Sequence, residues 1–332
     1  MSNPYDAILV LSFGGPEKRE DVIPFHANVL RGRNVPRERM LEVAEHYYEF
    51  GGHSPINDQN RALIEALKQE LAANGPSLPI YWGNRNWHPM LPDTLRQMRS
   101  DGVKRALAFV TSAYSSYSGC RQYREDIAKA RQEVGPGAPE VDKLRQFYDH
   151  PGFIGPMVEN VKAAAEKAGG PPELVFTAHS VPMSMARTSR YVDQLEAASR
   201  LVAEGAGFEL WKLVYQSRSG PPRPPWLEPD ICDYLRQPDR AKDVIVIPIG
   251  FISDHMEVVF DLDTEAQEVA EEVGMNLVRA ATVGVDPKFI SMIRELIVER
   301  INKGPEWSVC EADCCPRPVR QPARPATGRP AP

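Results

Sequence analysis

A histidine and two carboxylates follow directly after a long apolar stretch of the sequence. Residues 244–251 carry no charged side chain, and Asp254, His255 and Glu257 come shortly after them. Imidazole nitrogens and carboxylate oxygens are common ligands of divalent cations. If the apolar run is a buried strand, these groups lie just beyond its carboxyl end, and the pattern predicts a cation site there.

Three acidic residues continue this pattern at helical spacing. Glu257, Asp261 and Glu265 stand four residues apart, so a helix beginning near His255 places them on one face. Solvated helices usually interleave such residues with Lys or Arg, but residues 257–272 contain no basic residue. A bound cation would relieve the repulsion. The alternative is an acidic surface helix whose charge is favoured near its N-terminus by the helix dipole; the neighbouring histidine favours the cation site.

A second histidine, His179, ends another apolar run, residues 173–179. A single histidine at a strand end is more often structural than catalytic. In open parallel sheets, however, ligands bind beyond the carboxyl ends of the strands, so His179 could face Glu257 across a pocket. Ser180, which follows it, lacks the Gly-x-Ser-x-Gly context of a nucleophile elbow, and this excludes serine hydrolase chemistry.

The elements that must position these residues alternate between strand-like and helix-like patterns. Apolar runs of strand length cover residues 7–13, 79–82, 105–110, 173–179, 210–216, 243–251 and 276–281. Amphipathic helical segments cover residues 60–73, 95–99, 127–134, 157–167, 192–204 and 287–303. This alternation predicts parallel sheets with crossover helices. The series occurs twice, so we expect an α/β fold with two similar lobes, residues 1–150 and 151–303, facing an active-site cleft, followed by an extension, residues 304–332.

Length, composition and charge limit the classes of function that the protein can have. The 332 residues are 42% hydrophobic and 25% charged, which suits a globular protein of one large or two medium domains. A net charge of -6 without a basic stripe argues against nucleic acid as a partner. The segment 12–16 is too poor in glycine for a dinucleotide fingerprint and has no phosphate-loop lysine. Without a signal-peptide pattern or an apolar membrane span, we expect a cytoplasmic protein with no integral membrane contact.

The five cysteines are unevenly spread. Cys310, Cys314 and Cys315 lie within six residues, ahead of a tail, residues 316–332, that is rich in Pro and Arg and that we expect to be disordered. In a cytosolic chain such thiols indicate a soft metal or cluster. Cys120, after a strand end, is the better fourth ligand, because Cys232 is typical of a small buried residue on a helix. Four thiolates suit zinc or an iron–sulfur cluster equally; the remaining alternative is a fortuitous Cys-rich tail.

Five motifs, in order along the chain, resemble ferrochelatase. They are Leu-Ser-Phe-Gly-Gly-Pro-Glu at 11–17, Gly-Gly-His-Ser-Pro-Ile at 51–56, Phe-Thr-Ala-His-Ser-Val-Pro-Met at 176–183, Tyr-Gln-Ser-Arg at 215–218 with Pro-Trp-Leu at 225–227, and Pro-Ile-Gly-Phe-Ile-Ser-Asp-His-Met-Glu at 248–257. The resemblance covers residues 5–303. It implies two Rossmann-like, chelatase-type lobes that hold a porphyrin while Fe²⁺, a substrate, is inserted.

The resemblance also implies roles for particular residues. His179 and Glu257 would lie on opposite sides of the macrocycle as the catalytic pair, one accepting pyrrole protons and the other delivering or holding iron, and with Asp261 and Glu265 they would form the metal route. Substrate contacts would come from aromatic and polar side chains, namely Phe13, Arg31, Tyr47, Ser54, Tyr117, Trp226, Phe251 and His255. Phe13 stands where some bacterial members have Tyr, which excludes axial ligation of iron from this position.

The stretch 31–39 is charged, where membrane-bound relatives carry an apolar lip. This lip and the cysteine-rich tail resemble actinobacterial coproporphyrin ferrochelatases, which implies coproporphyrin III as substrate and a [2Fe–2S] cofactor on Cys120, Cys310, Cys314 and Cys315. Alternatives are a protoporphyrin IX ferrochelatase, a cobaltochelatase, which generally lacks the full second-lobe motifs, and a tetrapyrrole or iron carrier, which needs no proton acceptor. We expect a monomer, with the next haem-pathway enzyme as a possible partner.

Overall fold

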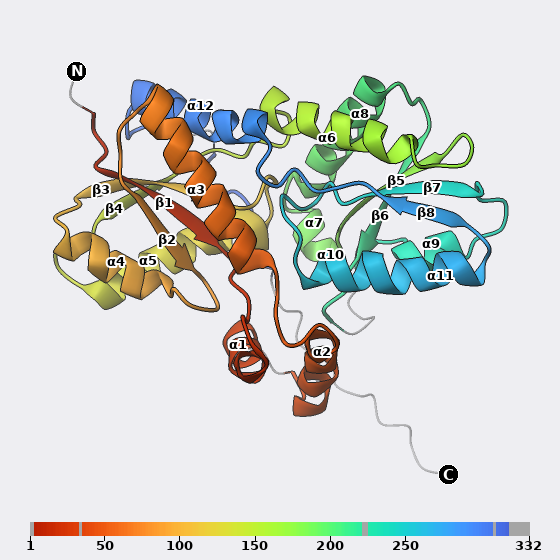
Figure 1. Cartoon of the computed structure of the whole chain (residues 1–332). Helices are drawn as coiled ribbons and strands as arrows, with labels where there is room; N and C mark the ends of the chain where they lie inside the picture. Colours follow the sequence, from red (N-terminus) through yellow and green to blue (C-terminus); the bar gives the residue numbers. More distant parts are fainter. Residues whose placement is uncertain (1–2, 33–34, 221–224, 308–309, 319–332) are drawn as a thin grey trace, which may run out of the picture.

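The computed structural model describes residues 3–32, 35–220, 225–307 and 310–318 and contains two four-stranded sheets, side by side in Figure 1. Every strand pair in both sheets is parallel. Helices flank both sheets (Figure 1). The predicted α/β fold of two lobes with parallel sheets is therefore confirmed.

The first sheet has the order β2-β1-β3-β4. Its strands are β1 (Ala7–Ser12), β2 (Ile80–Asn84), β3 (Arg105–Val110) and β4 (Glu140–Lys143). The helices around it are α3 (Ile56–Asn74), α4 (Leu91–Ser100) and α5 (Gln122–Val134). All six residues of β1 are buried, as expected for a central parallel strand covered on both faces.

The second sheet repeats this arrangement with the order β6-β5-β7-β8. Its strands are β5 (Glu173–His179), β6 (Trp211–Gln216), β7 (Asp243–Ile247) and β8 (Asn276–Arg279). The longer helices around it are α6 (Pro151–Ala165), α8 (Tyr191–Ala206) and α11 (Ala266–Glu272), and the shorter ones are α7 (Met183–Ala186), α9 (Ile231–Leu235) and α10 (Met256–Phe260).

The two lobes share one hydrophobic core. A single cluster of buried side chains draws on one face of each sheet, including Ile8 and Phe109 from the first and Phe176 and Ile247 from the second. The last helix, α12 (Pro287–Lys303), packs against both α6 and α3, above the two sheets in Figure 1. This shared packing fixes one lobe relative to the other.

Two helices that the sequence did not predict project below the lobes in Figure 1, α1 (Val22–Val29) and α2 (Arg37–Glu49). Helix α2 reaches the second lobe, where the ring of His46 stacks on Phe260 of α10 with 3.9 Å between ring centroids. No helix in the described part of the chain has the length and apolarity needed to cross a membrane.

One predicted strand is too long. The sequence prediction extended it to Phe251, but β7 ends at Ile247. Pro248 has no N–H for the ladder, the N–H of Ile249 turns back to the carbonyl of Ile247, and that of Gly250 crosses to the carbonyl of Thr177 in β5. The chain therefore leaves the sheet four residues before the predicted strand end. Residues 251–257 then pass the carboxyl end of β5, where His179 lies.

Candidate functional site

His179 and Glu257 are in direct contact. His179 is the last residue of β5 and Glu257 lies in the first turn of α10, and the His179 Nε2 to Glu257 Oε1 distance is 3.4 Å. The other ring nitrogen, Nδ1, lies 2.5 Å from the carbonyl oxygen of Ser180. The structure thus brings the two predicted catalytic residues together. A planar macrocycle lying between them requires the two side chains to part.

Both ring nitrogens of His179 face acceptors, so the ring carries two protons and is an imidazolium. Burial opposes this charge, but the charge and hydrogen bond of Glu257, with smaller contributions from the Ser180 carbonyl and Asp261, together outweigh burial and raise the pKa of His179 to about 9. Burial likewise favours the neutral form of Glu257, and the charge of His179 overcomes it and holds the pKa of Glu257 below its usual value. At neutral pH the pair is ionic. His179 becomes a proton acceptor only when Glu257 moves away.

The three spaced carboxylates lie on one continuous helical segment, but the helix is not regular. After α10, residues 261–265 form a π-helical turn, η3 (Asp261–Glu265), which runs into α11. Such wide turns occur mostly as single-turn bulges, often at functional sites. The even four-residue spacing predicted a plain α-helix, and on this point the prediction is wrong.

Asp261 is the carboxylate most changed by its surroundings. Burial raises the pKa of Asp261 to about 7, against a hydrogen bond from the Ser217 hydroxyl to its Oδ2 atom. Burial also raises the pKa of Glu265. Within the described residues, no three His, Cys, Asp or Glu side chains are already arranged to hold a metal ion together, so the assignment of His179, Glu257, Asp261 and Glu265 to metal binding stays a prediction.

His255 and Phe251 form the wall beside Glu257. The Nδ1 atom of His255 accepts the N–H of Glu257 at 3.2 Å, which caps α10, and the His255 ring meets Phe251 edge-on at 4.7 Å. Burial lowers the pKa of His255, so this ring is neutral. The adjacent Asp254 binds Arg279 through its carboxylate and Gln59 of α3 through its N–H, and it thereby joins the two lobes at the site.

The first lobe adds aromatic side chains. Phe13, which is 37% exposed, meets Phe25 at 6.2 Å between centroids, and Phe25 meets Tyr47 at 6.0 Å. Burial, with a further contribution from the charges of Glu257 and Asp261, raises the pKa of Tyr47 above its ordinary value. Tyr47 therefore lies within electrostatic reach of the second-lobe carboxylates. Sequence reasoning missed Phe25, the residue that joins these rings.

The polar residues predicted to bind substrate have other partners here. Ser54 is 2% exposed and packs against Gly15. The Tyr117 hydroxyl donates to Glu125 at 2.9 Å. Arg31 is exposed and its guanidinium donates to Asn28. Trp226 packs closely over Gly220 and bridges to Pro182. Their roles in substrate binding stay predictions.

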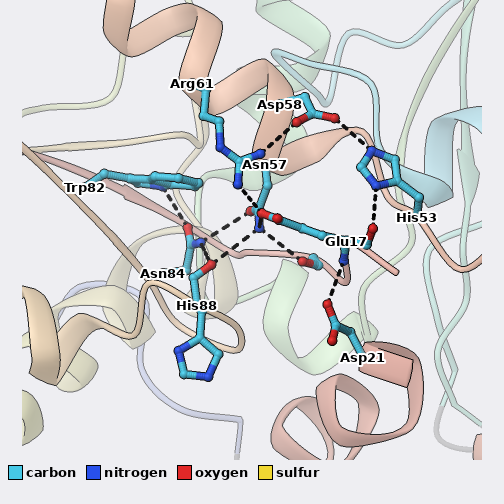
Figure 2. A network of polar contacts seen from close by, with 10 residues as sticks. Glu17, Asp21, His53, Asn57, Asp58, Arg61, Trp82, Asn84 and His88 are labelled. Atoms are coloured by element: carbon cyan, nitrogen blue, oxygen red, sulfur yellow. Dashed lines mark hydrogen bonds and ion pairs between the residues drawn. The ribbon is translucent and has the colours of Figure 1, made fainter. Parts of the chain in front are cut away.

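Figure 2 shows the network that joins the two first-lobe motifs. The ring of His53 lies between the carbonyl of Glu17, at 3.0 Å, and the carboxylate of Asp58, at 2.8 Å. Arg61 pairs with Glu17 and Asp58, and Asn57 donates to Glu17 at 2.8 Å. The bond to the Glu17 carbonyl is the main cause of the raised pKa of His53, with burial opposing it. The polar residues of these two motifs therefore support the loop after β1.

A cavity of about 510 Å³ borders this network. Its lining residues are Glu17, Asp21, Arg61, Trp87, His88, Pro89, Met90 and Asp93. None of the residues predicted for metal or substrate binding lines it, so the cavity does not mark the predicted site.

The four predicted cluster ligands gather beside α5. Cys120 lies in a second π-helical turn, η2 (Tyr117–Arg121), and is 1% exposed. Hydrogen bonds with Cys310 and Cys315 hold the pKa of the Cys120 thiol well below its usual range, whereas the same contacts raise the pKa values of Cys310 and Cys315. Cys314 contacts Cys310. Cys232, predicted as a small buried residue on a helix, lies on α9 and is partly buried.

Basic side chains hold the cysteine-bearing extension in place. Arg121 donates to the carbonyl oxygen of Cys314 at 3.0 Å, and Arg124 approaches the Cys314 sulfur at 3.6 Å. Arg317 binds Tyr117 and Glu125. The first residues of the predicted disordered tail are therefore anchored, and residues 319–332 lie outside the described residues.

The sheets and the comparison with solved structures define a two-lobed chelatase fold. The sirohydrochlorin chelatase SirB from Bacillus subtilis subspecies spizizenii, in complex with cobalt, superposes with a TM-score of 0.56 at 12% sequence identity, covering 91% of this chain and 97% of that one. More narrowly, the family model described as Ferrochelatase matches residues 5–301. The chain belongs to the ferrochelatase family.

Curated relatives align over almost the whole chain. A protein described as "Ferrochelatase" from Rhodopirellula baltica is 55% identical, covering 98% of this chain and 97% of its own. Proteins described as "Coproporphyrin III ferrochelatase" come from Mycobacteroides abscessus, at 52% identity with 91% of this chain and 90% of its own covered, and from Streptomyces coelicolor, at 48% with 97% and 96% covered.

Proposed function

We propose that this protein is a coproporphyrin III ferrochelatase, a metal chelatase of the lyase class that inserts Fe²⁺ into coproporphyrin III to give Fe-coproporphyrin in haem biosynthesis. Membership of the ferrochelatase family supports the reaction. Relatives described as coproporphyrin III ferrochelatases, at 48–52% identity over nearly the full chain, support the substrate. The observation that carries the proposal within the structure is the contact between His179 and Glu257 at 3.4 Å.

His179 and Glu257 can together accept the protons that a porphyrin loses and hold the entering metal ion. A porphyrin loses two pyrrole protons as a divalent ion enters, so the site needs a proton acceptor near neutral pKa and a polar route for the ion. When the macrocycle separates the pair, the imidazole loses its carboxylate and its pKa falls from about 9. One of the two residues then accepts protons while the other holds iron. Asp261, with a pKa of about 7, can pass protons or cations onward with Glu265.

Aromatic walls and a charged lip fit this substrate class. Phe13 on the first lobe, with Phe251 and Trp226 on the second, supplies flat apolar surface for a macrocycle. Arg31 is exposed and can pair with the carboxylates of a porphyrin that is richer in them than protoporphyrin. The His255 ring, packed on Phe251, completes this wall.

We also propose that Cys120, Cys310, Cys314 and Cys315 hold a [2Fe–2S] cluster. The donor set fits in kind, because Cys120 contacts Cys310 and Cys315, and Cys314 contacts Cys310. Among the described residues no three of these thiols are already arranged around a common centre. A bound cluster would supply an electron-transfer centre and tie the extension to α5. Iron and acid-labile sulfide in anaerobically purified protein test this: Cys120→Ser should lose both and Cys232→Ser should keep both. Wild-type protein without sulfide would overturn the assignment.

A metallation assay tests the function. Wild-type protein is mixed anaerobically with Fe²⁺ or Co²⁺ and with coproporphyrin III or protoporphyrin IX, and the absorption spectrum is followed. We expect the highest kcat/KM for Fe²⁺ with coproporphyrin III, and we expect His179→Ala to abolish turnover while porphyrin still quenches the protein fluorescence. Binding without turnover in the wild type would indicate a carrier, and a preference for Co²⁺ a cobaltochelatase. The cytoplasmic location, the monomeric state and the next pathway enzyme as partner stay predictions.

A further inference from the structure

The side chain of a buried glutamine contacts the helical segment that carries Glu257, Asp261 and Glu265. Gln216 is the last residue of β6, lies opposite His179 in the sheet register, and is 1% exposed. Its Nε2 atom donates to the main-chain carbonyl of Glu257 and lies 3.5 Å from Oδ2 of Asp261. Since a main-chain carbonyl can only accept, the amide must turn its NH₂ group towards Glu257.

The helix changes its geometry at this contact. In a regular α-helix the carbonyl of Glu257 would accept the N–H of Asp261. Here the N–H of Asp261 donates to the carbonyl of Val258, and the π-helical turn begins at Asp261 itself. An inserted side chain is a recognised cause of such irregularities. Gln216 takes up the carbonyl that the widened turn releases.

The other end of the amide is unsatisfied. Among the described residues none donates to Oε1 of Gln216, although this atom is buried. A buried acceptor without a donor lowers stability. Such a local cost is expected where a residue is retained for function.

Resting on the proposed function, we propose that Gln216 is a positioning residue for metal insertion: it holds the wide turn open and thereby sets Asp261 relative to Glu257 along the cation's route. Ser217, the next residue, supports the same arrangement by donating to Asp261 from a left-handed backbone conformation, at φ 59°. Gln216 and Ser217 thus donate hydrogen bonds to the Glu257 carbonyl and the Asp261 carboxylate, which lie one turn apart.

The test compares Gln216→Met with Gln146→Met in full-length protein. Both replace a buried glutamine by an apolar side chain of similar length. Gln146 is 7% exposed and lies in a loop outside the segment 257–265. For Gln216→Met we expect the KM for Fe²⁺ to rise about tenfold, the effect of losing one hydrogen bond, with the KM for coproporphyrin III within about twofold. Gln146→Met should change neither KM.

Hydrogen exchange gives a readout that needs no turnover. In Gln216→Met the amides of residues 257–266 should exchange faster than in wild type, since the turn loses its anchor, while other segments keep their rates. Unchanged exchange, an unchanged KM for Fe²⁺, or an equal rise of both KM values would overturn the assignment. A wild-type protein without metallation activity would instead refute the proposed function, and the exchange comparison would still decide the role of Gln216 in the turn.

Discussion

Replacing Glu257 with Gln should return His179 to a neutral, basic imidazole. The substitution keeps the size of the side chain but removes the negative charge that lies 3.4 Å from Nε2 of His179. The Ser180 carbonyl and Asp261 still favour the imidazolium, but burial, the largest single influence on the ring, disfavours it. We therefore expect the pKa of His179 to fall from about 9 to its ordinary value of 6.5 or below.

The same change should lower stability in a limited pH range. The span from 6.5 to about 9, at about 1.4 kcal/mol for each pH unit, gives an upper value of about 3.5 kcal/mol. The Glu257 side chain is 42% exposed and water screens the pair, so we expect a loss of about 1–2 kcal/mol.

The sign follows from the two titrations. A raised pKa of His179 stabilises the folded state fully below 6.5, and this contribution is lost as the pH rises through about 9. A lowered pKa of Glu257 stabilises it above 4.5, and that contribution is lost as the pH falls through the lowered value. The difference in unfolding free energy between wild type and Glu257→Gln should therefore be largest between 4.5 and 6.5 and fall towards zero above about pH 9.

Two measurements check this prediction. Protein labelled with ¹³C in its seven histidines is titrated by NMR, with the His179 signal identified as the one missing from His179→Asn, and urea unfolding is measured at about pH 6 and about pH 9.5. Glu204→Gln, at an exposed pair with Arg200, is the control and should lose little at either pH. A His179 that still titrates near 9 in Glu257→Gln would refute the reasoning.

Three further substitutions test other contacts. Ser217→Ala removes a hydroxyl whose hydrogen bond opposes burial, so the pKa of Asp261 should rise above about 7, and the pH midpoint of the KM for Fe²⁺ should move up with it; an unmoved midpoint contradicts this. Phe260→Ala removes the ring stacked on His46 and should cost about 3 kcal/mol of unfolding free energy with faster hydrogen exchange in α2; unchanged exchange there would show that the stack does not hold this helix. Gly250→Ala would place a Cβ 2.7 Å from the main chain of β5, and we expect a loss of about 1–3 kcal/mol, measured by urea unfolding; full stability would mean that the strand end can move aside.

The apolar pattern predicted the sheets well because their central strands are buried on both faces. The bounds of β3 and β5 agree with the predicted runs to the residue. The same rule explains the omissions. Helix α2 buries only Ala44 and has no apolar stripe to detect, and β4 is a short, largely charged edge strand. Elements that make few core contacts leave little periodicity in the sequence.

The site was predictable where it depends on strand ends. His179 and Glu257 follow neighbouring strands, and the carboxyl ends of parallel strands meet at one edge. Side-chain orientation was harder to infer. Tyr117 was predicted as a substrate contact, yet its hydroxyl is bound by Glu125 and by Arg317 from the far end of the chain, and no local pattern relates residues about 200 apart.

The two π-helical turns occupy equivalent places in the two lobes. Turn η2, with Cys120, follows β3, and turn η3, with Asp261, follows β7, and these strands hold the same position in their sheets. A wide turn shifts side chains out of the regular helical spacing and exposes backbone groups to outside partners. Turn η3 has no sequence signal of its own, because it opens around Gln216 from another strand. Both proposed ligand sets therefore rely on a helix irregularity that only the assembled lobe creates.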